Sequence, residues 1–462
     1  MIDALRLTLG WALVWALGIA AVVATTPSST LERPGERAWI AGCGFFVGAF
    51  LLTLWMRGLS LAGIRFSLAS IGLPIAIATM ALGWYAWKRW LRTTAPRVPM
   101  ARGQRVLVIA LAAWLAFRFV VLLLDVVWTP LYPWDAWIQW ATKSRVWYEL
   151  GRIVPFGRSE AWFAANGAIW FDASPNYPAT VPLWQVWSSV ALARFDDALM
   201  NLPWWLTAVA FAIAVFGALR SGGFDIVGAW IGTWLVSSLP LANVHVALAG
   251  YADLPMAAYF ALAALALWRW SLRRALDDAV LAAVLAIACT TIKTPGIVWA
   301  LCLVPGVVLT TMPRHAPRII AFGLFAALMT LAVLAQTSPV ILGYRLHLDF
   351  APAWQALADS LFLLGNWHLL WYVAIAVAIA AWRDVRSPAL APLAVVLAAG
   401  LVFLLVAFSF TNARNWVTEQ TTVNRAVLHI APLVLVFTLL AVHAWFARRR
   451  AAGGLQPAAA TG

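Results

Sequence analysis

The sequence predicts an all-α protein that crosses a membrane many times, and its composition and hydropathy pattern support this fold class. Of its 462 residues, 64% are hydrophobic and only 11% are charged, whereas soluble domains carry about 25% charged residues. The apolar residues come in blocks of roughly 18–24, which is long enough for a helix to cross the ~30 Å hydrocarbon core of a bilayer. The short alternating segments of a membrane barrel do not occur in this pattern.

The apolar blocks predict about thirteen transmembrane spans. In chain order they lie near residues 5–25, 38–56, 66–87, 106–127, 199–219, 225–245, 254–272, 278–292, 296–312, 318–335, 365–382, 389–410 and 426–447. Residues 179–195 are predicted to form a surface or re-entrant helix instead of a span. The Ala- and Gly-rich tail after Arg450 is predicted to be disordered.

The distribution of Lys and Arg predicts the orientation of these spans. Loop 88–105 has six basic residues and no acidic residue, which is typical of a cytoplasmic loop. Alternation from this loop puts four further basic clusters on the same side, namely Arg273/Arg274, Arg314/Arg318, Arg383/Arg386 and Arg448–Arg450. The formal charge of +14 is thereby explained by membrane topology, and no nucleic-acid partner is predicted.

The opposite face receives a long loop, residues 128–198, which has no positive bias. It carries six acidic and five basic residues, and eleven tryptophans lie between Trp128 and Trp205. These aromatic residues are consistent with an interfacial belt and with amphipathic helices that lie on the membrane over a site. Long ordered loops usually carry function, so this face is where a site is expected.

Two acidic residues on this face are candidate catalytic groups. Asp135, in Pro-Trp-Asp-Ala-Trp, follows the end of a span and has two interpretations: an N-cap of the next helix or a general base at the membrane surface. Asp253, in Tyr-Ala-Asp-Leu-Pro, lies at the outer mouth of a span. An N-cap before Pro255 accounts for it structurally, and its position on the same face as Asp135 favours a functional role.

Four basic residues are candidate phosphate ligands. Lys293 interrupts an apolar stretch in Thr-Thr-Ile-Lys-Thr-Pro-Gly, where it either snorkels to the interface or offers its charge to a phosphate. Arg345, Arg414 and Arg425 lie in the later outer loops. An arginine there either grips a phosphate with two hydrogen bonds or anchors a helix. The three cysteines lie inside apolar blocks and are interpreted as packing residues.

Taken together, these residues resemble the GT-C superfamily of membrane glycosyltransferases, such as the protein O-mannosyltransferases and the lipid A aminoarabinose transferases. Asp135 matches the acid of the first outer loop, and Asp253 matches the second acid. Asn176-Tyr177-Pro178 with Pro182 looks like the Tyr-Pro element before a juxtamembrane helix. Asn424-Arg425 through His429 and Pro432 is similar to the start of a late helix in that family.

The match around Lys293 departs from the family pattern. Thr291-Ile292-Lys293-Thr294-Pro295-Gly296 looks like the Thr-Lys-Asn-Glu-Gly element, but Ile292 is inserted and Thr-Pro replaces Asn-Glu. The resemblance covers about 106–447, which gives three predicted parts. These are N-terminal spans over 1–105 outside the resemblance, a catalytic module over 106–447 with the outer loop 128–198, and a basic cytoplasmic tail over 448–462.

The resemblance implies a glycosyltransferase of a bacterial inner membrane, with its active site facing the periplasm. The donor would be a polyprenyl-phosphate-linked sugar, and the acceptor a lipid, a glycan or a protein. Asp135 and Asp253 would be catalytic, and the four basic residues would hold the donor phosphate. Sugar or acceptor contacts would come from Trp134, Trp137, Tyr177 and His429. Members of the family differ in whether they use a metal ion, so the resemblance leaves the need for a divalent cation open.

Two other functions remain open from the sequence alone. A lipid-linked glycan ligase or polymerase would depend on outer-face arginines and a histidine such as His347, without an essential Asp135. A transporter or flippase would be expected to show inverted repeats and acids near the bilayer midplane. No internal repeat is evident, and the acids lie at helix ends.

Overall fold

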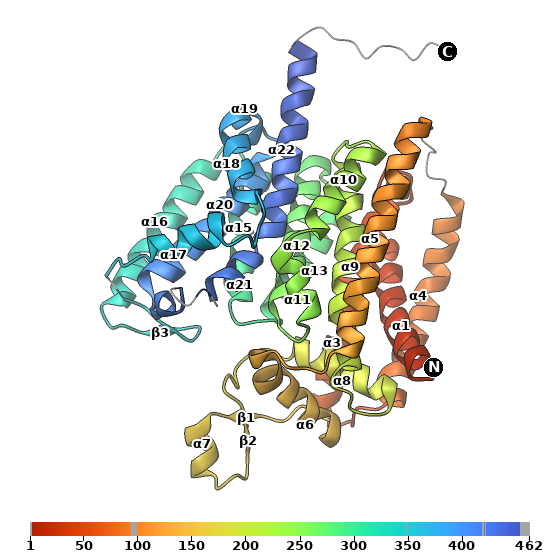
Figure 1. Ribbon diagram of the computed structural model, residues 1–462, viewed down its shortest axis with the longest axis vertical. Helices are drawn as coiled ribbons and strands as arrows, with labels where there is room; N and C mark the ends of the chain where they lie inside the picture. The colour runs from red at the N-terminus through yellow and green to blue at the C-terminus, as the bar shows by residue number, and fades with distance from the viewer. Residues whose placement is uncertain (1, 94–98, 348, 418–419, 421, 453–462) are drawn as a thin grey trace. The chain divides into compact units, whose positions relative to one another are not determined.

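The computed structural model describes residues 2–93, 99–347, 349–417, 420 and 422–452 (Figure 1). It divides into two compact units. Unit 1 comprises residues 1–266 and 275–301, and unit 2 comprises residues 267–274 and 302–462. Of the predicted tail 448–462, residues 448–452 continue the last helix, and residues 453–462 lie outside the described part, as do residues 94–98 of the predicted cytoplasmic loop.

Unit 1 begins with a first group of helices. They are α1 (Ile2–Thr25), α2 (Ser28–Leu31), α3 (Glu36–Leu61), the π-helix η1 (Leu68–Gly72), α4 (Leu73–Arg92) and α5 (Arg102–Trp128). A second group follows the long loop: α9 (Leu202–Ser221), α10 (Ile226–Ser237), α11 (Pro240–Ala247), α12 (Asp253–Arg273), α13 (Leu276–Thr290) and α14 (Gly296–Leu301). In unit 1, α3 packs against both α1 and α9.

Small residues allow the close approach of α1 and α3. A Cβ atom on Gly18 would lie 1.8 Å from the carbonyl oxygen of Gly44, and one on Gly48 would lie 2.0 Å from that of Val14. Without a hydrophobic driving force between helices inside a bilayer, such backbone proximity is a main source of helix–helix attraction. These glycines therefore let the backbones of α1 and α3 pack directly against each other.

The long loop of unit 1 is folded into short elements. These are the π-helix η2 (Ala136–Ala141), α6 (Thr142–Leu150), β1 (Phe156–Gly157), α7 (Ser159–Ala164), β2 (Trp170–Phe171), α8 (Thr180–Leu192) and the 3₁₀ helix η3 (Leu199–Asn201). Strands β1 and β2 pair in parallel. Helix α8 matches the predicted helix 179–195, and nearly all of its residues are buried inside unit 1.

Aromatic side chains surround α8 inside unit 1. Trp184 is fully buried and packs against Trp11, Phe45 and Tyr259. The indole nitrogen of Trp11 donates a hydrogen bond to Oγ of Ser188 at 3.0 Å. Several of the aromatic residues of the predicted interfacial belt are thus core residues, because α8 is packed among α1, α3, α6 and α9.

Unit 2 contains the remaining elements. They are α15 (Val304–Thr311), α16 (Ala316–Ala335), β3 (Val340–Ile341), β4 (Tyr344–Arg345), α17 (Trp354–Ala358), the π-helix η4 (Asp359–Leu363), α18 (Leu370–Ala380), α19 (Trp382–Val385), α20 (Ala391–Phe410), the 3₁₀ helix η5 (Asn412–Trp416), α21 (Thr422–Leu428) and α22 (Ala431–Ala452). Strands β3 and β4 form an antiparallel hairpin. Helix α19 is tied to α22 by a bidentate ion pair between Asp384 and Arg448.

Eight helices of the described residues are long and apolar enough to cross a membrane: Ile2–Thr25, Glu36–Leu61, Leu68–Arg92, Arg102–Trp128, Leu199–Ser221, Ala316–Ala335, Ala391–Phe410 and Ala431–Ala452. The pair α10 and α11 meets the same test but is bent by 61°. The protein is therefore a helical membrane protein, as its composition predicts. The other predicted spans correspond to helices that do not meet this test by themselves, including α12, α13 and α18.

Candidate functional site

Two residues that the sequence singled out separately form a direct ion pair in unit 1. Nζ of Lys293 lies 2.6 Å from Oδ1 of Asp253. Asp253 is the first residue of α12 and is fully buried, whereas the Lys293 side chain, in the turn after α13, keeps 12% of its surface exposed. A buried carboxylate requires a partner of this kind, so each charge stabilises the position of the other.

Gly296 explains how Lys293 reaches Asp253. A Cβ atom at residue 296 would lie 1.9 Å from the carbonyl oxygen of Cys289 and 2.8 Å from Cε of Met256. Only glycine lets the start of α14 approach α13 and α12 so closely. The backbone N–H of Gly296 also donates a hydrogen bond to the carbonyl oxygen of Lys293 at 2.8 Å, which closes the turn.

The turn before Asp253 packs against the segment that contains Asp135. Gly250 has a φ of +105°, and a Cβ atom on it would lie 2.7 Å from Cβ of Ala136. Indole Nε1 of Trp204 donates a hydrogen bond to the carbonyl oxygen of Tyr251 at 2.7 Å and fixes this turn. The two candidate acids therefore lie on neighbouring turns. Asp135 directly precedes Ala136, and Asp253 follows Gly250 by three residues.

Asp135 does not cap a helix through its side chain. Its backbone is already helical, and the carbonyl oxygen of Pro133 accepts hydrogen bonds from the N–H groups of Ala136 and Trp137. The Asp135 carboxylate accepts no capping hydrogen bond from the backbone of η2. The capping interpretation of this residue is therefore wrong, because Pro133 provides the first acceptor of the helix. The Asp135 side chain is half-buried at this position.

A hydrogen-bonded chain next to Lys293 includes an arginine that the sequence did not single out. Nη2 of Arg57, near the end of α3, donates a hydrogen bond to Oγ1 of Thr180 at 2.9 Å. Thr180 Oγ1 in turn donates to Oγ1 of Thr291 at 3.0 Å, two residues before Lys293. Nε of Arg57 is buried and has no hydrogen-bond partner among the described residues. A second cation thus lies beside the Lys293 turn.

No sequence pattern singles out Arg57 as a functional residue. It lies in an apolar block within residues 1–105, outside the part that carries the resemblance, and a basic residue near a helix end is an ordinary membrane anchor. Its neighbours Thr180 and Thr291 are 123 and 234 positions away. Only the packing of α3 against α8 and α13 brings the three side chains together.

A buried ion pair organises the loop that leads into α8. Nζ of Lys143 lies 3.1 Å from Oδ2 of Asp172, and both side chains are almost fully buried. Lys143 also donates a hydrogen bond to the carbonyl oxygen of Ser174 at 2.8 Å. Burial raises the pKa of Asp172 and lowers the pKa of Lys143, and the attraction between the two groups offsets part of both shifts.

The predicted sugar contact Tyr177 lies close to this ion pair. Its ring stacks on Trp140, with ring centroids 5.1 Å apart and an angle of 12° between the planes. Nζ of Lys143 lies 5.8 Å from the centre of the Trp140 ring. Trp134 and Trp137 form an edge-to-face pair and are both exposed, at 64% and 44%. These two tryptophans offer the accessible aromatic surface beside Asp135.

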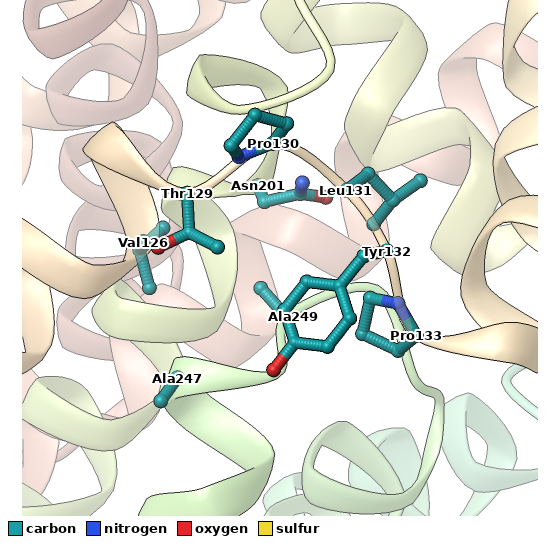
Figure 2. Close-up of a pocket in the computed structure, with 9 residues that line it drawn as sticks. All are labelled: Val126, Thr129, Pro130, Leu131, Tyr132, Pro133, Asn201, Ala247 and Ala249. Carbon is teal, nitrogen blue, oxygen red and sulfur yellow. The ribbon is translucent and has the colours of Figure 1, made fainter.

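A small cavity lies next to the Asp135 segment (Figure 2). The end of α5, the segment Thr129–Pro133, Asn201 and the chain after α11 surround it. In Figure 2 the Tyr132 ring extends between Pro133 and Ala249. The cavity therefore lies between the residues that precede Asp135 and the end of the bent helix pair.

The other predicted ligands lie in unit 2. The backbone N–H of Arg345, in β4, donates a hydrogen bond to Oδ1 of Asn412. Nη1 of Arg414 lies 2.5 Å from Oδ2 of Asp349, and this hydrogen bond lowers the pKa of Asp349 below its usual value. Arg425 is half-buried in α21. His429 is buried in the turn between α21 and α22.

The carboxylate of Asp253 is not set up as a ligand for a divalent cation. An ammonium group already lies in contact with it, and hard cations require several oxygen ligands. Among the described residues, no group of three His, Cys, Asp or Glu side chains is placed to hold a metal ion.

Comparison of the chain with protein-family models, with curated proteins and with solved structures gives no match.

Proposed function

We propose that this protein is a membrane glycosyltransferase of the GT-C type, with thirteen spans and its active site on the periplasmic face of a bacterial inner membrane. It would transfer a sugar from a polyprenyl-phosphate carrier to a lipid, glycan or protein acceptor. The observation that carries the proposal is the convergence of three turns in unit 1. The Asp135 turn touches the Gly250–Asp253 turn, and Asp253 is ion-paired with the Lys293 turn.

In the proposed reaction, a hydroxyl oxygen of the acceptor attacks the anomeric carbon of the donor sugar. The bond between that carbon and the phosphate oxygen breaks, and the electron pair leaves with the phosphate. The acceptor proton passes to the carboxylate of Asp135, which acts as general base. General-base catalysis typically contributes about 10²–10⁴-fold to the rate.

The leaving phosphate gains negative charge during this displacement, and cations next to it stabilise the transition state. Lys293 is proposed to supply one charge and Arg57 a second. Asp253 is proposed to act through Lys293, because its carboxylate holds the ammonium group. Arg425, Arg345 and Arg414 stay proposed phosphate ligands from unit 2, and Trp134, Trp137, Tyr177 and His429 stay proposed sugar or acceptor contacts.

Asp135→Asn tests the proposal directly. The purified protein in nanodiscs receives a polyprenyl-phosphate-linked hexose with a radiolabelled sugar and a membrane extract as acceptor. Wild-type protein should transfer the label, and Asp135→Asn should reduce transfer by about 10²–10⁴-fold. Asn is nearly the same size as Asp, and the Asp135 side chain does not cap η2, so folding should persist.

Glu160→Gln is the matched control, because Glu160 is an exposed acid on the same loop. It should transfer the sugar at the wild-type rate. Transfer by Asp135→Asn at the rate of the control would exclude Asp135 as the base.

A further inference from the structure

A groove of about 960 Å³ lies in unit 1 between the first turns of α1 and α4. Helix α8 and Tyr148 of α6 complete its walls. Its lining is mainly apolar, with Leu9, Leu13, Leu68, Leu73, Trp187 and Val190 among the side chains. Both α1 and α4 are candidate membrane spans, so the groove lies near one end of the bilayer core.

Two glycines keep the floor of the groove open. A Cβ atom on Gly72 would lie 3.2 Å from Cδ1 of Leu68 and 3.4 Å from Cη2 of Trp187. A Cβ atom on Gly10 would lie 3.1 Å from Cβ of Ala191. Larger side chains at either position would therefore enter the space above the Trp187 ring.

Arg6 is the only cationic residue among the described residues that line the groove. Arg6 lies on α1 one turn before Leu9 and two turns before Leu13, so the apolar wall extends about 10 Å from it along the helix. Arg6 is exposed and makes no hydrogen bond or ion pair within the described residues. The nearby acid Asp3 is instead paired with Arg194, at 3.0 Å.

We propose that this groove binds one glycerophospholipid with an anionic headgroup. The phosphate would lie at Arg6, with the phenol of Tyr148 as a hydrogen-bonding group, and an acyl chain would occupy the apolar length of the groove. Cationic side chains between transmembrane helices are suited to anionic lipid headgroups, and an apolar groove open to a bilayer is suited to a hydrocarbon chain. The bound lipid would stabilise α1 and α4 against α8.

The groove is separate from the candidate catalytic site. Thr180 contacts Arg57 at the start of α8, whereas Val190 lines the groove ten residues later, about 15 Å along the helix. Trp184 lies between these positions, is fully buried and fills that space with Trp11 and Phe45. The proposed lipid is for this reason a structural phospholipid and not the tail of a sugar donor, and the inference does not depend on the proposed transferase activity.

Native mass spectrometry of the full-length protein tests this inference. The protein is taken from nanodiscs of equal parts phosphatidylglycerol and phosphatidylethanolamine, and the lipids that it retains are counted after stepwise delipidation. Wild-type protein should retain one phosphatidylglycerol. Gly72→Leu should fill the groove and abolish retention of the phosphatidylglycerol. Ala76→Leu narrows the same groove and should weaken this retention. Gly83→Leu is the control on the same helix, because no atom lies within 4 Å of its Cβ position.

The headgroup is tested with Arg6→Gln. A basic residue near a membrane surface contributes about fivefold to the binding of an anionic lipid, so the preference for phosphatidylglycerol should fall by about that factor. Arg158→Gln removes another exposed charge and should leave the preference unchanged. Retention of the lipid by both Gly72→Leu and Ala76→Leu would overturn the proposal. Loss of a polyprenyl phosphate in these variants, in place of a phospholipid, would overturn it as well.

Discussion

The Nζ atom of Lys293 lies 2.6 Å from Oδ1 of Asp253, although the two residues are 40 positions apart and belong to different turns. This contact changes the interpretation of both residues. Lys293 does not simply snorkel to the interface, and Asp253 does not act as an isolated carboxylate. A mutation of either residue therefore changes the electrostatic surroundings of the other.

The first prediction separates a structural role of this pair from a functional one. Lys293→Met removes the ammonium from a fully buried carboxylate, and breaking a buried ion pair typically costs about 3–5 kcal/mol. Lys293→Met/Asp253→Asn removes both charges and should recover much of that stability. If Lys293 binds the donor phosphate, sugar transfer should stay low in the double variant. Thermal unfolding and transfer are measured on the same preparations, and full activity of the double variant would show that the pair is only structural.

The second prediction concerns the contact between the two acid-bearing turns. Gly250→Ala places a methyl group 2.7 Å from Cβ of Ala136 and forces a positive φ on alanine. Gly63→Ala is the control, because Gly63 also has a positive φ but has no atom within 4 Å of its Cβ position. Gly250→Ala should lower the unfolding free energy by about 1–3 kcal/mol more than the control, since overpacking has that cost. Equal effects of the two variants would contradict close packing of the turns.

The third prediction concerns Arg57. Hydrogen bonds to charged groups contribute about 1.5–3 kcal/mol, so Arg57→Gln should raise the KM for the lipid-linked donor by about 10–100-fold. Thr180→Val removes the hydroxyl that accepts the hydrogen bond from Arg57 and should raise the KM by a smaller factor. Arg158→Gln serves as the control for loss of one positive charge. An unchanged donor KM in Arg57→Gln, at normal thermal stability, would exclude Arg57 from phosphate binding.

The fourth prediction concerns the buried pair Lys143–Asp172. Lys143→Met should destabilise the protein by about 3–5 kcal/mol, and Lys143→Met/Asp172→Leu should be closer to wild type, because desolvation of both charges is then avoided. Since burial raises the pKa of Asp172, the folded state takes up a proton before the unfolded state does on acidification. As the pH falls from about 7 to about 4, the unfolding free energy of the wild type should therefore rise relative to that of Asp172→Asn. The melting temperatures of both proteins are measured across this pH range. A wild-type melting temperature that falls relative to that of Asp172→Asn on acidification would refute the prediction.

The fifth prediction fixes the orientation in the membrane. Ser159→Cys places a thiol at the start of α7 in the long loop, and Gly103→Cys places one at the start of α5, where nothing lies within 4 Å of the Cβ position. The native cysteines are buried. In intact spheroplasts an impermeant maleimide should label Ser159→Cys and not Gly103→Cys. The reverse pattern would place the candidate site in the cytoplasm.

The sequence by itself determined that the protein is helical and lies in a membrane. Block length is a local property, because about 20 apolar residues must form a helix to satisfy their backbone groups in lipid. Helices such as α3, α5 and α20 accordingly lie within a few residues of the predicted spans. Sequence also identified Asp135, Asp253 and Lys293 as polar residues at the ends of apolar blocks.

The tertiary structure alone decided which of these polar residues meet. The ion pair of Asp253 with Lys293, the chain from Arg57 to Thr291 and the buried partner of Lys143 each join segments that are distant in sequence. Such contacts depend on which helices pack together and on the rotation of each helix about its axis. Hydropathy carries little information on either, because a helix that is apolar on all sides fits a bilayer in any rotation. Small residues such as Gly250 and Gly296 set these contacts, since they decide where two backbones approach closely.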